Sequence, residues 1–301
     1  MPRAAGTHQL LAKDERGGAS GAVRPGANGL ATDGYVVVRQ VLNPREVARL
    51  RSEVHAVLDQ KGKPLDGGSV LPNAAAQAPT LSWVFAHERV VEAVRANTDL
   101  QRLVFTAEAD VHRNFLLGQW HKDSGEGNLP RGYFDCDAMS SDDCRVYKVA
   151  LYLQDHVDGS GLTVRPGTTH QPDLAAGDEA AVAVHAGDMV LFDVRITHRG
   201  AVPTKVDAAV SKIQEKLKWR SLQSVSPLLR RWKYKMANKP DRLAIYFAFG
   251  APNEKSETFA CRNMQRQLAQ LHLTECRLPS ELLDRLSSLN VQVATLSALS
   301  E

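Results

Sequence analysis

The sequence predicts a mainly β fold with flanking helices, built around an antiparallel sandwich or barrel. From about residue 103 to residue 250, short apolar runs alternate with turns rich in Gly, Pro, Asp and Ser. With one exception, no helical segment separates these runs, and strands at this spacing are typical of antiparallel sandwiches and barrels. Segments with helical periodicity precede and follow the region, and we expect them to flank the sheets.

The part of the chain before this region supplies one strand and two helices. DGYVVVRQVL, residues 33–42, is rich in β-branched residues and is expected to form a strand. NPREVARLRSEVHAVLDQ follows, with an Asn-Pro helix start and apolar residues at helical spacing. HERVVEAVRANTDL, from residue 87, has the same spacing. Residues 1–28 are rich in Gly, Ala and charged residues without periodicity, which predicts a disordered tail.

The strands are expected in five stretches, RLVFTAEADVHRNFLLGQW, RVYKVALYLQDH, DGSGLTVRPGTTH, AAVAVHAGDMVLFDVRITHRG and DRLAIYFAFG. Together with the preceding strand and helices they predict one domain over residues 29–262. Residues 263–301 have helical periodicity again and are expected to form an extension that covers the barrel or a dimer interface.

The exception among the strands is a basic helical insertion at about residues 203–240. Residues 205–242 hold eleven Lys or Arg and three acidic residues, a net charge of +8, and since the whole chain is +3, the rest carries −5. Lys212 and Lys216 flank an apolar helical stripe. We expect them to help hold an anionic substrate, although a solvated helical face explains the same pattern.

Composition excludes several classes of protein. The 301-residue chain is 43% hydrophobic, as expected for a globular core, and has no apolar run of 18 residues or more. The N-terminus lacks the apolar stretch of a signal peptide, so we expect a cytoplasmic protein without a membrane span. The four cysteines show no CxxC spacing and are expected to be reduced thiols.

The stretch GQWHKDSGEG holds the strongest chemical signal. Residues i and i+2 of a strand point to one face, so His121 and Asp123 can lie side by side. His198 ends the apolar run GDMVLFDVRITH and can supply a second imidazole. Two histidines and one carboxylate form a facial triad that leaves three metal positions open, which indicates catalysis rather than structure. A His-x-Asp pair alone is common by chance, so the surrounding pattern matters.

Three ordered blocks supply that pattern. WHKD, ALYLQDHVDGSGLTVRPGTTH and GDMVLFDVRITHRG together resemble the phytanoyl-CoA dioxygenase family of iron(II)- and 2-oxoglutarate-dependent oxygenases, over roughly residues 30–250. The resemblance implies a double-stranded β-helix, or jelly roll, with His121, Asp123 and His198 as iron ligands and with 2-oxoglutarate and O2 as cosubstrates. By the same resemblance His170, in PGTTH, shapes a turn.

The family also pairs the far carboxylate of 2-oxoglutarate with an arginine about a dozen residues after the distal histidine. Position 209 is alanine here, a departure from the family pattern. Arg242, at the head of LAIYFAFG, has the expected context if residues 203–240 displace the last strand. Arg199 competes with it, but neighbours on a strand point to opposite faces, which favours Arg242.

Other candidate residues follow from position and charge. Gln119 shares the parity of His121 and would contact the cosubstrate or an iron-bound water, or else satisfy a hydrogen bond of the barrel. Lys148 and Tyr152 share one face of their strand, and the sequence leaves open which face looks inward. The residues expected to contact substrate are Lys148, Tyr152, Arg165, Lys212 and Lys216.

The predicted function is therefore hydroxylation of an unactivated C–H bond in a small molecule, such as a natural product or an anionic molecule linked to phosphate, CoA or a carrier. The alternative is a non-catalytic jelly-roll binding protein. A third reading, an oxygenase that acts on nucleic acid, rests on the cations and aromatic residues of RRWKYK, but the acidic remainder of the chain disfavours it. The sequence is compatible with a monomer and with a homodimer.

Overall fold

The structure is a computed structural model that describes residues 29–65, 68–115, 117–123, 142–157, 161–201 and 241–295. The expected N-terminal tail and the basic insertion with Lys212 and Lys216 lie outside the described residues. Within them, no helix is long and apolar enough to cross a membrane. Of the three described cysteines, Cys144 and Cys261 are buried and Cys276 is half-buried.

The N-terminal elements follow the sequence patterns. After helix α1 (Gly29–Asp33) and strand β1 (Tyr35–Val38), helix α2 spans Pro44–Lys61. A capping box starts α2, because Asn43 Oδ1 accepts the N–H of Glu46 at 3.0 Å while Glu46 Oε2 accepts the N–H of Asn43 at 2.7 Å. The predicted Asn-Pro helix start is thus confirmed. The second predicted helix is α5 (Glu88–Thr98).

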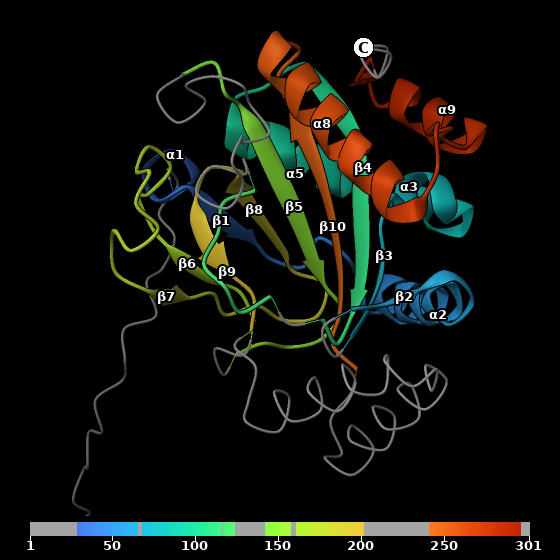
Figure 1. Cartoon of the computed structure of the whole chain (residues 1–301), viewed down its shortest axis with the longest axis horizontal. Helices are drawn as coiled ribbons and strands as arrows, with labels where there is room; N and C mark the ends of the chain where they lie inside the picture. The colour runs from blue at the N-terminus through green and yellow to red at the C-terminus, as the bar shows by residue number, and fades with distance from the viewer. Residues whose placement is uncertain are drawn as a thin grey trace, which may run out of the picture.

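The large sheet has the order β1-β8-β5-β10-β4-β3-β2 (Figure 1), and β11 pairs with β4. Its pairs are antiparallel except that of β11 with β4. The bounds of its further strands are β2 (Lys63–Leu65), β3 (Gly68–Leu71), β4 (Leu103–Arg113), β5 (Val146–Tyr152), β8 (Met189–Asp193), β10 (Leu243–Gly250) and β11 (Val291–Val293).

The small sheet has the order β7-β6-β9, formed by β7 (Ala180–Ala181), β6 (Thr163–Arg165) and β9 (Thr197–Arg199). The segment at His121 extends it, because His121 and His198 exchange two backbone hydrogen bonds of 2.9 Å. Side chains of β5, β8 and β10 in the large sheet pack against Val164 of the small sheet. Two antiparallel sheets that pack face to face, with flanking helices, confirm the predicted jelly roll.

Alternation along the central strands decides which side chains face the small sheet. Odd-numbered residues such as Ile245 and Leu151 join the core that includes α2 and α5. Even-numbered residues, Tyr246 and Tyr152 among them, pack instead with Val164 of the small sheet. The face that carries Lys148 and Tyr152, which the sequence left undecided, thus looks into the barrel.

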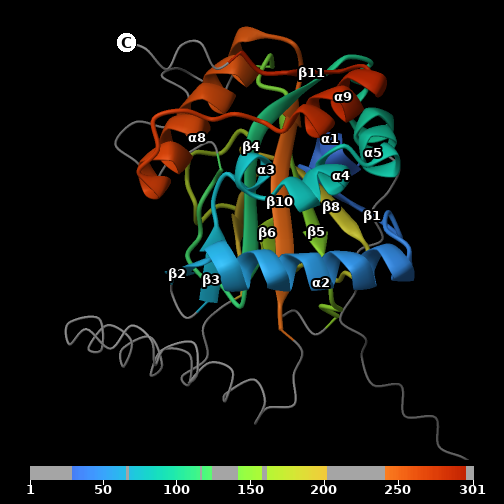
Figure 2. The ribbon, with the colours of Figure 1, turned by 90° about the vertical axis from the view of Figure 1, so that its right-hand side faces the viewer.

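The remaining helices form two groups (Figure 2). Helices α3 (Ala74–Gln77), η1 (Pro79–Leu81), α4 (Ser82–Phe85) and α9 (Ser280–Ser288) accompany α2 and α5. Helix α8 (Glu254–Leu271) packs through Phe259 on Ala248, on the even-numbered face. Asn253 caps α8 by accepting the N–H of Ser256 at 3.1 Å, so this helix begins before residue 263 and spans the boundary expected between the barrel and its extension.

Candidate active site

One cluster of metal-ligating side chains appears in the described part of the chain. His121, Asp123 and His198 each place a ligand atom within 4.8 Å of the other two. Oδ1 of Asp123 lies 3.8 Å from Nε2 of each histidine. The pairing of the His121 segment with β9 sets the two imidazole centroids 4.3 Å apart. The three residues predicted from the sequence therefore come together.

Backbone contacts orient both imidazoles. Nδ1 of His121 lies 2.9 Å from the carbonyl oxygen of Gln119, and Nδ1 of His198 lies 3.1 Å from that of Ile196. If each Nδ1–H donates to its carbonyl, each Nε2 lone pair faces Asp123, which is the arrangement of metal-ligating histidines. The donor set and its orientation fit iron(II).

Electrostatics keep Asp123 and His198 in the protonation state that a metal requires. Burial opposes ionisation of Asp123, but Lys148 and the two histidines outweigh it and hold the pKa of Asp123 well below its usual range. Burial, with a further contribution from His121, lowers the pKa of His198 to about 4. At neutral pH the site thus offers a carboxylate and a neutral buried imidazole, as metal binding needs.

A buried ion pair lies beside the triad. Lys148 Nζ is 2.6 Å from Glu108 Oε1 and 3.6 Å from Asp123 Oδ2. Burial disfavours the ammonium, yet Asp123 and Glu108 raise the pKa of Lys148, so it stays protonated. The sequence placed Lys148 near the site but gave no sign of Glu108, which lies on β4 beyond β10.

Lys122, between His121 and Asp123 in sequence, has a structural role that the sequence did not reveal. Its side chain is 2% exposed, and its ammonium donates to the carbonyl oxygens of Thr168 at 2.7 Å and Arg195 at 2.5 Å. These bonds connect the segment with His121 and Asp123 to the PGTTH turn and to the β8–β9 connection. His170 itself is exposed and is not part of the triad cluster.

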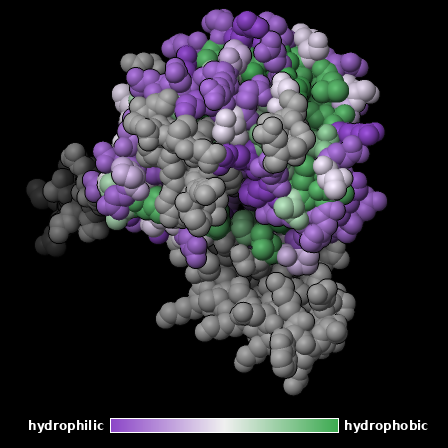
Figure 3. Space-filling model, turned by 45° about the horizontal axis from the view of Figure 1, so that its top comes forward, coloured by the Kyte–Doolittle hydropathy of each residue, from purple (hydrophilic) through white to green (hydrophobic). Residues whose placement is uncertain are grey.

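The triad opens into a cavity of about 390 Å³. One part of its wall is apolar and includes Phe115, Leu162 and Phe192. Helix α8 supplies a polar part with Asn263, Arg266 and Gln270. The predicted C-terminal helix therefore contributes directly to the site. The space-filling view shows a largely hydrophilic face on the described part of the surface, with hydrophobic residues in small groups (Figure 3).

Arg242 lies just before β10, where its N–H donates to Asn114 Oδ1 at 2.9 Å. Arg242 is even-numbered, like Ala244 and Tyr246 of β10, whose side chains face the inside of the barrel. Its positive charge acts on the hydroxyls of Tyr152 and Tyr246, which are hydrogen-bonded to each other. Arg242 is absent from the residues that line the triad cavity, whereas Arg266 lines it.

Two other candidate residues, Gln119 and Arg165, are not among the residues that line the triad cavity. The side chain of Gln119 is exposed and lies outside the cavity wall, so this residue serves the site through its carbonyl oxygen. Arg165 lies on the other face of the small sheet, where its guanidinium stacks 4.4 Å from the Trp120 ring and pairs with Glu179 at 3.2 Å. Arg199 stacks on the same ring at 4.3 Å, as its parity predicted.

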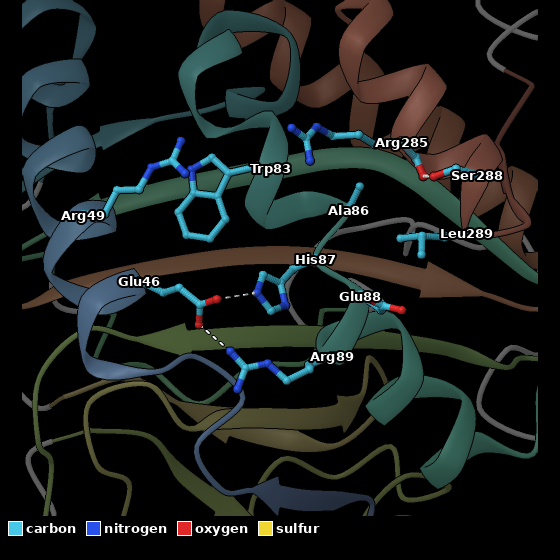
Figure 4. Close-up of a pocket in the computed structure, with 10 residues that line it drawn as sticks. All are labelled: Glu46, Arg49, Trp83, Ala86, His87, Glu88, Arg89, Arg285, Ser288 and Leu289. Carbon is cyan, nitrogen blue, oxygen red and sulfur yellow. Dashed lines mark hydrogen bonds and ion pairs between the residues drawn. The ribbon is translucent and has the colours of Figure 1, made fainter.

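A second, larger cavity of about 480 Å³ lies between α2, α5 and α9 (Figure 4). Trp83 and His87 line it, but its three arginines are each paired with a glutamate: Arg49 with Glu53, Arg89 with Glu46, and Arg285 with Glu281. This cavity contains no described cluster of metal ligands. Chemistry rather than volume therefore selects the triad cavity as the candidate active site.

The stability of the metal-free protein should fall on acidification. Burial lowers the pKa of His112, in the cavity wall, to about 4, below the value of about 6.5 of an unfolded histidine. Below pH 6.5 the unfolded chain binds a proton at His112, whereas the folded chain does not. The free energy of unfolding therefore falls with pH until about pH 4. We expect His112 to account for a loss of up to about 2 kcal/mol between pH 7 and 5. Urea unfolding at both pH values should show this loss reduced in His112→Gln; an unchanged loss would contradict the assignment.

Solved structures share this architecture. The non-heme alpha-ketoglutarate-dependent epimerase SnoN from nogalamycin biosynthesis is 16% identical over 75% of this chain and 81% of its own, with a TM-score of 0.53. HygX from Streptomyces hygroscopicus, with nickel and 2-oxoglutarate bound, is 17% identical over 74% and 84%, with a TM-score of 0.52. EctD from S. alaskensis, with bound Fe, is 15% identical over 75% of both chains, with a TM-score of 0.50. These likenesses concern the fold.

Sequence comparison finds a family model over part of the chain. The phytanoyl-CoA dioxygenase (PhyH) family model matches residues 30–130, a range that includes His121 and Asp123. This match agrees with the resemblance seen in the sequence. Among the similar solved structures, HygX holds nickel and 2-oxoglutarate and EctD holds Fe. No curated protein sequence matches this chain significantly.

Proposed function

We propose that this protein hydroxylates an unactivated C–H bond of a small-molecule substrate, with His121, Asp123 and His198 as its iron ligands. The observation that carries the proposal is the triad, whose two Nε2 atoms lie 3.8 Å from Asp123 Oδ1 at a cavity. Three protein ligands leave three positions of an octahedral metal open, whereas a structural site would be closed. The same geometry disfavours a non-catalytic binding protein.

The chain's own residues would bind and orient the reactants. Bound iron, 2-oxoglutarate and O2 together supply the oxidant that removes hydrogen from carbon. Arg242 is our candidate for the far carboxylate of 2-oxoglutarate, because a guanidinium offers a planar pair of donors and Arg242 shares the inward parity. The apolar wall with Phe115, Leu162 and Phe192 would exclude water from the substrate carbon.

The substrate is proposed to carry an anionic group. Lys148 lines the cavity, but Glu108 and Asp123 already surround its ammonium. Arg266 also lines the cavity and is our candidate for this contact, because its guanidinium is positively charged and its side chain is one-third exposed. Tyr152 is 3% exposed and acts at most through Tyr246. The cytoplasmic location, a homodimer and the roles of Lys212 and Lys216 stay predictions.

The decisive test is anaerobic titration of the wild-type protein with iron(II) and 2-oxoglutarate. We expect the weak visible charge-transfer band of the chelate to appear, because the triad leaves two adjacent positions for the cosubstrate. A well-folded, iron-loaded protein that develops no band would contradict the proposal and favour a binding protein.

The reaction type needs a separate measurement. SnoN is an epimerase, and SnoK, whose structure has a TM-score of 0.52, is a carbocyclase, so similar folds support outcomes other than hydroxylation. Once a substrate is found, turnover in ¹⁸O2 should yield a product heavier by one labelled oxygen. A product without the label would replace hydroxylation by ring closure, desaturation or epimerisation.

A further inference from the structure

Asp123 presents its two carboxylate oxygens to different partners. Oδ1 lies 3.8 Å from the Nε2 atoms of His121 and His198, on the side where a metal would bind. Oδ2 faces the ammonium of Lys148 at 3.6 Å. The two oxygens are therefore already distinguished by the protein around them.

The ammonium that faces Oδ2 is itself held firmly. Glu108 Oε1 lies 2.6 Å from Lys148 Nζ, and the two residues are 0% and 7% exposed. A buried ion pair of this kind is costly to desolvate and is weak evidence for stability. This ion pair lies next to Asp123, a proposed metal ligand, and its position there indicates a function other than stability.

The backbone of β4 is adapted to form the pair. Lys148 on β5 and Glu108 on β4 are separated by β10, where the residue paired with Lys148 is the small Ala248. The register of β4 with β10 shifts between Phe247 and Phe249, and Ala107 has a φ of 62°, which is strained for a residue with a side chain. Bulges commonly redirect a side chain beside an active site. This one precedes Glu108 directly.

We propose that Lys148, anchored by Glu108, is a positioning residue that holds Oδ2 of Asp123 away from the metal, so that only Oδ1 binds it. The inference rests on the proposed iron-ligand role of Asp123. Monodentate binding has a chemical consequence. A carboxylate that bound through both oxygens would fill a fourth of six positions, and 2-oxoglutarate would then take the last two, with none left for O2.

The test is the double variant Glu108→Gln/Lys148→Met, compared with wild type by binding of Co(II) to the metal-free protein. Removing both charges avoids leaving a buried glutamate without its partner. The lost cation is nearer to the metal than the lost anion, so the change in charge by itself would favour metal binding. We nevertheless expect Co(II) affinity to fall by about tenfold or more, because Asp123 loses its orientation. The ligand-field bands of bound Co(II) should shift as its coordination changes.

Two further variants separate positioning from folding. Lys148→Arg keeps a cation beside Asp123 and should retain bands close to those of wild type. Asp188→Asn removes a carboxylate that is 1% exposed and pairs with Arg39 outside the cavity, so it should lower the unfolding temperature without shifting the bands.

The outcomes distinguish this inference from the proposed function. A folded double variant with wild-type affinity and bands would overturn the positioning role, even if its unfolding temperature fell. A wild-type protein that binds neither Co(II) nor iron(II) would overturn the proposed function and the positioning role with it.

Discussion

His198→Ala should reduce iron(II) affinity by on the order of 100-fold or more, since loss of an outer partner alone commonly costs 10- to 100-fold and this change removes a proposed ligand. His198 is 5% exposed, and its Nε2 lies 3.8 Å from Asp123 Oδ1, so the substitution removes one of the three proposed donor atoms. Binding is measured by anaerobic titration with iron(II), and the chelate band with 2-oxoglutarate should disappear.

His170→Ala is the matched control. His170 lies in the PGTTH turn, is exposed and is not part of the metal-ligating cluster. Iron affinity should therefore be unchanged. Equal losses in both variants would show a general effect on folding, and an undiminished affinity in His198→Ala would mean that the triad is not the iron site.

Arg242→Ala should weaken 2-oxoglutarate binding about 10- to 100-fold, the equivalent of a charge-assisted hydrogen bond of about 1.5–3 kcal/mol. Iron affinity should not change, because Arg242 is not one of the triad residues. The dissociation constant is obtained from the chelate band at increasing 2-oxoglutarate concentration.

Two other arginines make this prediction specific. Arg199→Ala should have no effect, because Arg199 stacks on Trp120 and pairs with Glu179 at 2.6 Å on the other face of the small sheet. Arg266 lines the triad cavity, so Arg266→Ala tests the competing assignment. If Arg266→Ala weakens 2-oxoglutarate binding and Arg242→Ala does not, the cosubstrate anchor is on α8 and our assignment is wrong.

Local patterns in the sequence were sufficient for most of the fold. Asn43 and Pro44 specified the start of α2 because capping involves atoms only a few residues apart. Alternation along β5 and β10 predicted strands with two different faces, as observed. The hairpin of β2 and β3 and the parallel strand β11 were missed, since they are short and are defined by their pairing with β4.

The candidate site also combines residues that the sequence predicted with residues that only the structure revealed. The sequence by itself predicted that His121, Asp123 and His198 come together, because His121 and Asp123 are two residues apart and three ordered blocks resembled one family. Only the tertiary structure decided that Lys148 faces inward, that Glu108 reaches it across Ala248, and that Arg266 of α8 lines the cavity. The structure also places Arg165 against Trp120, on the face of the small sheet that points away from the cavity. The physical reason is range: periodicity and capping act over a few residues, whereas burial and ion pairing between distant strands depend on how the whole chain packs.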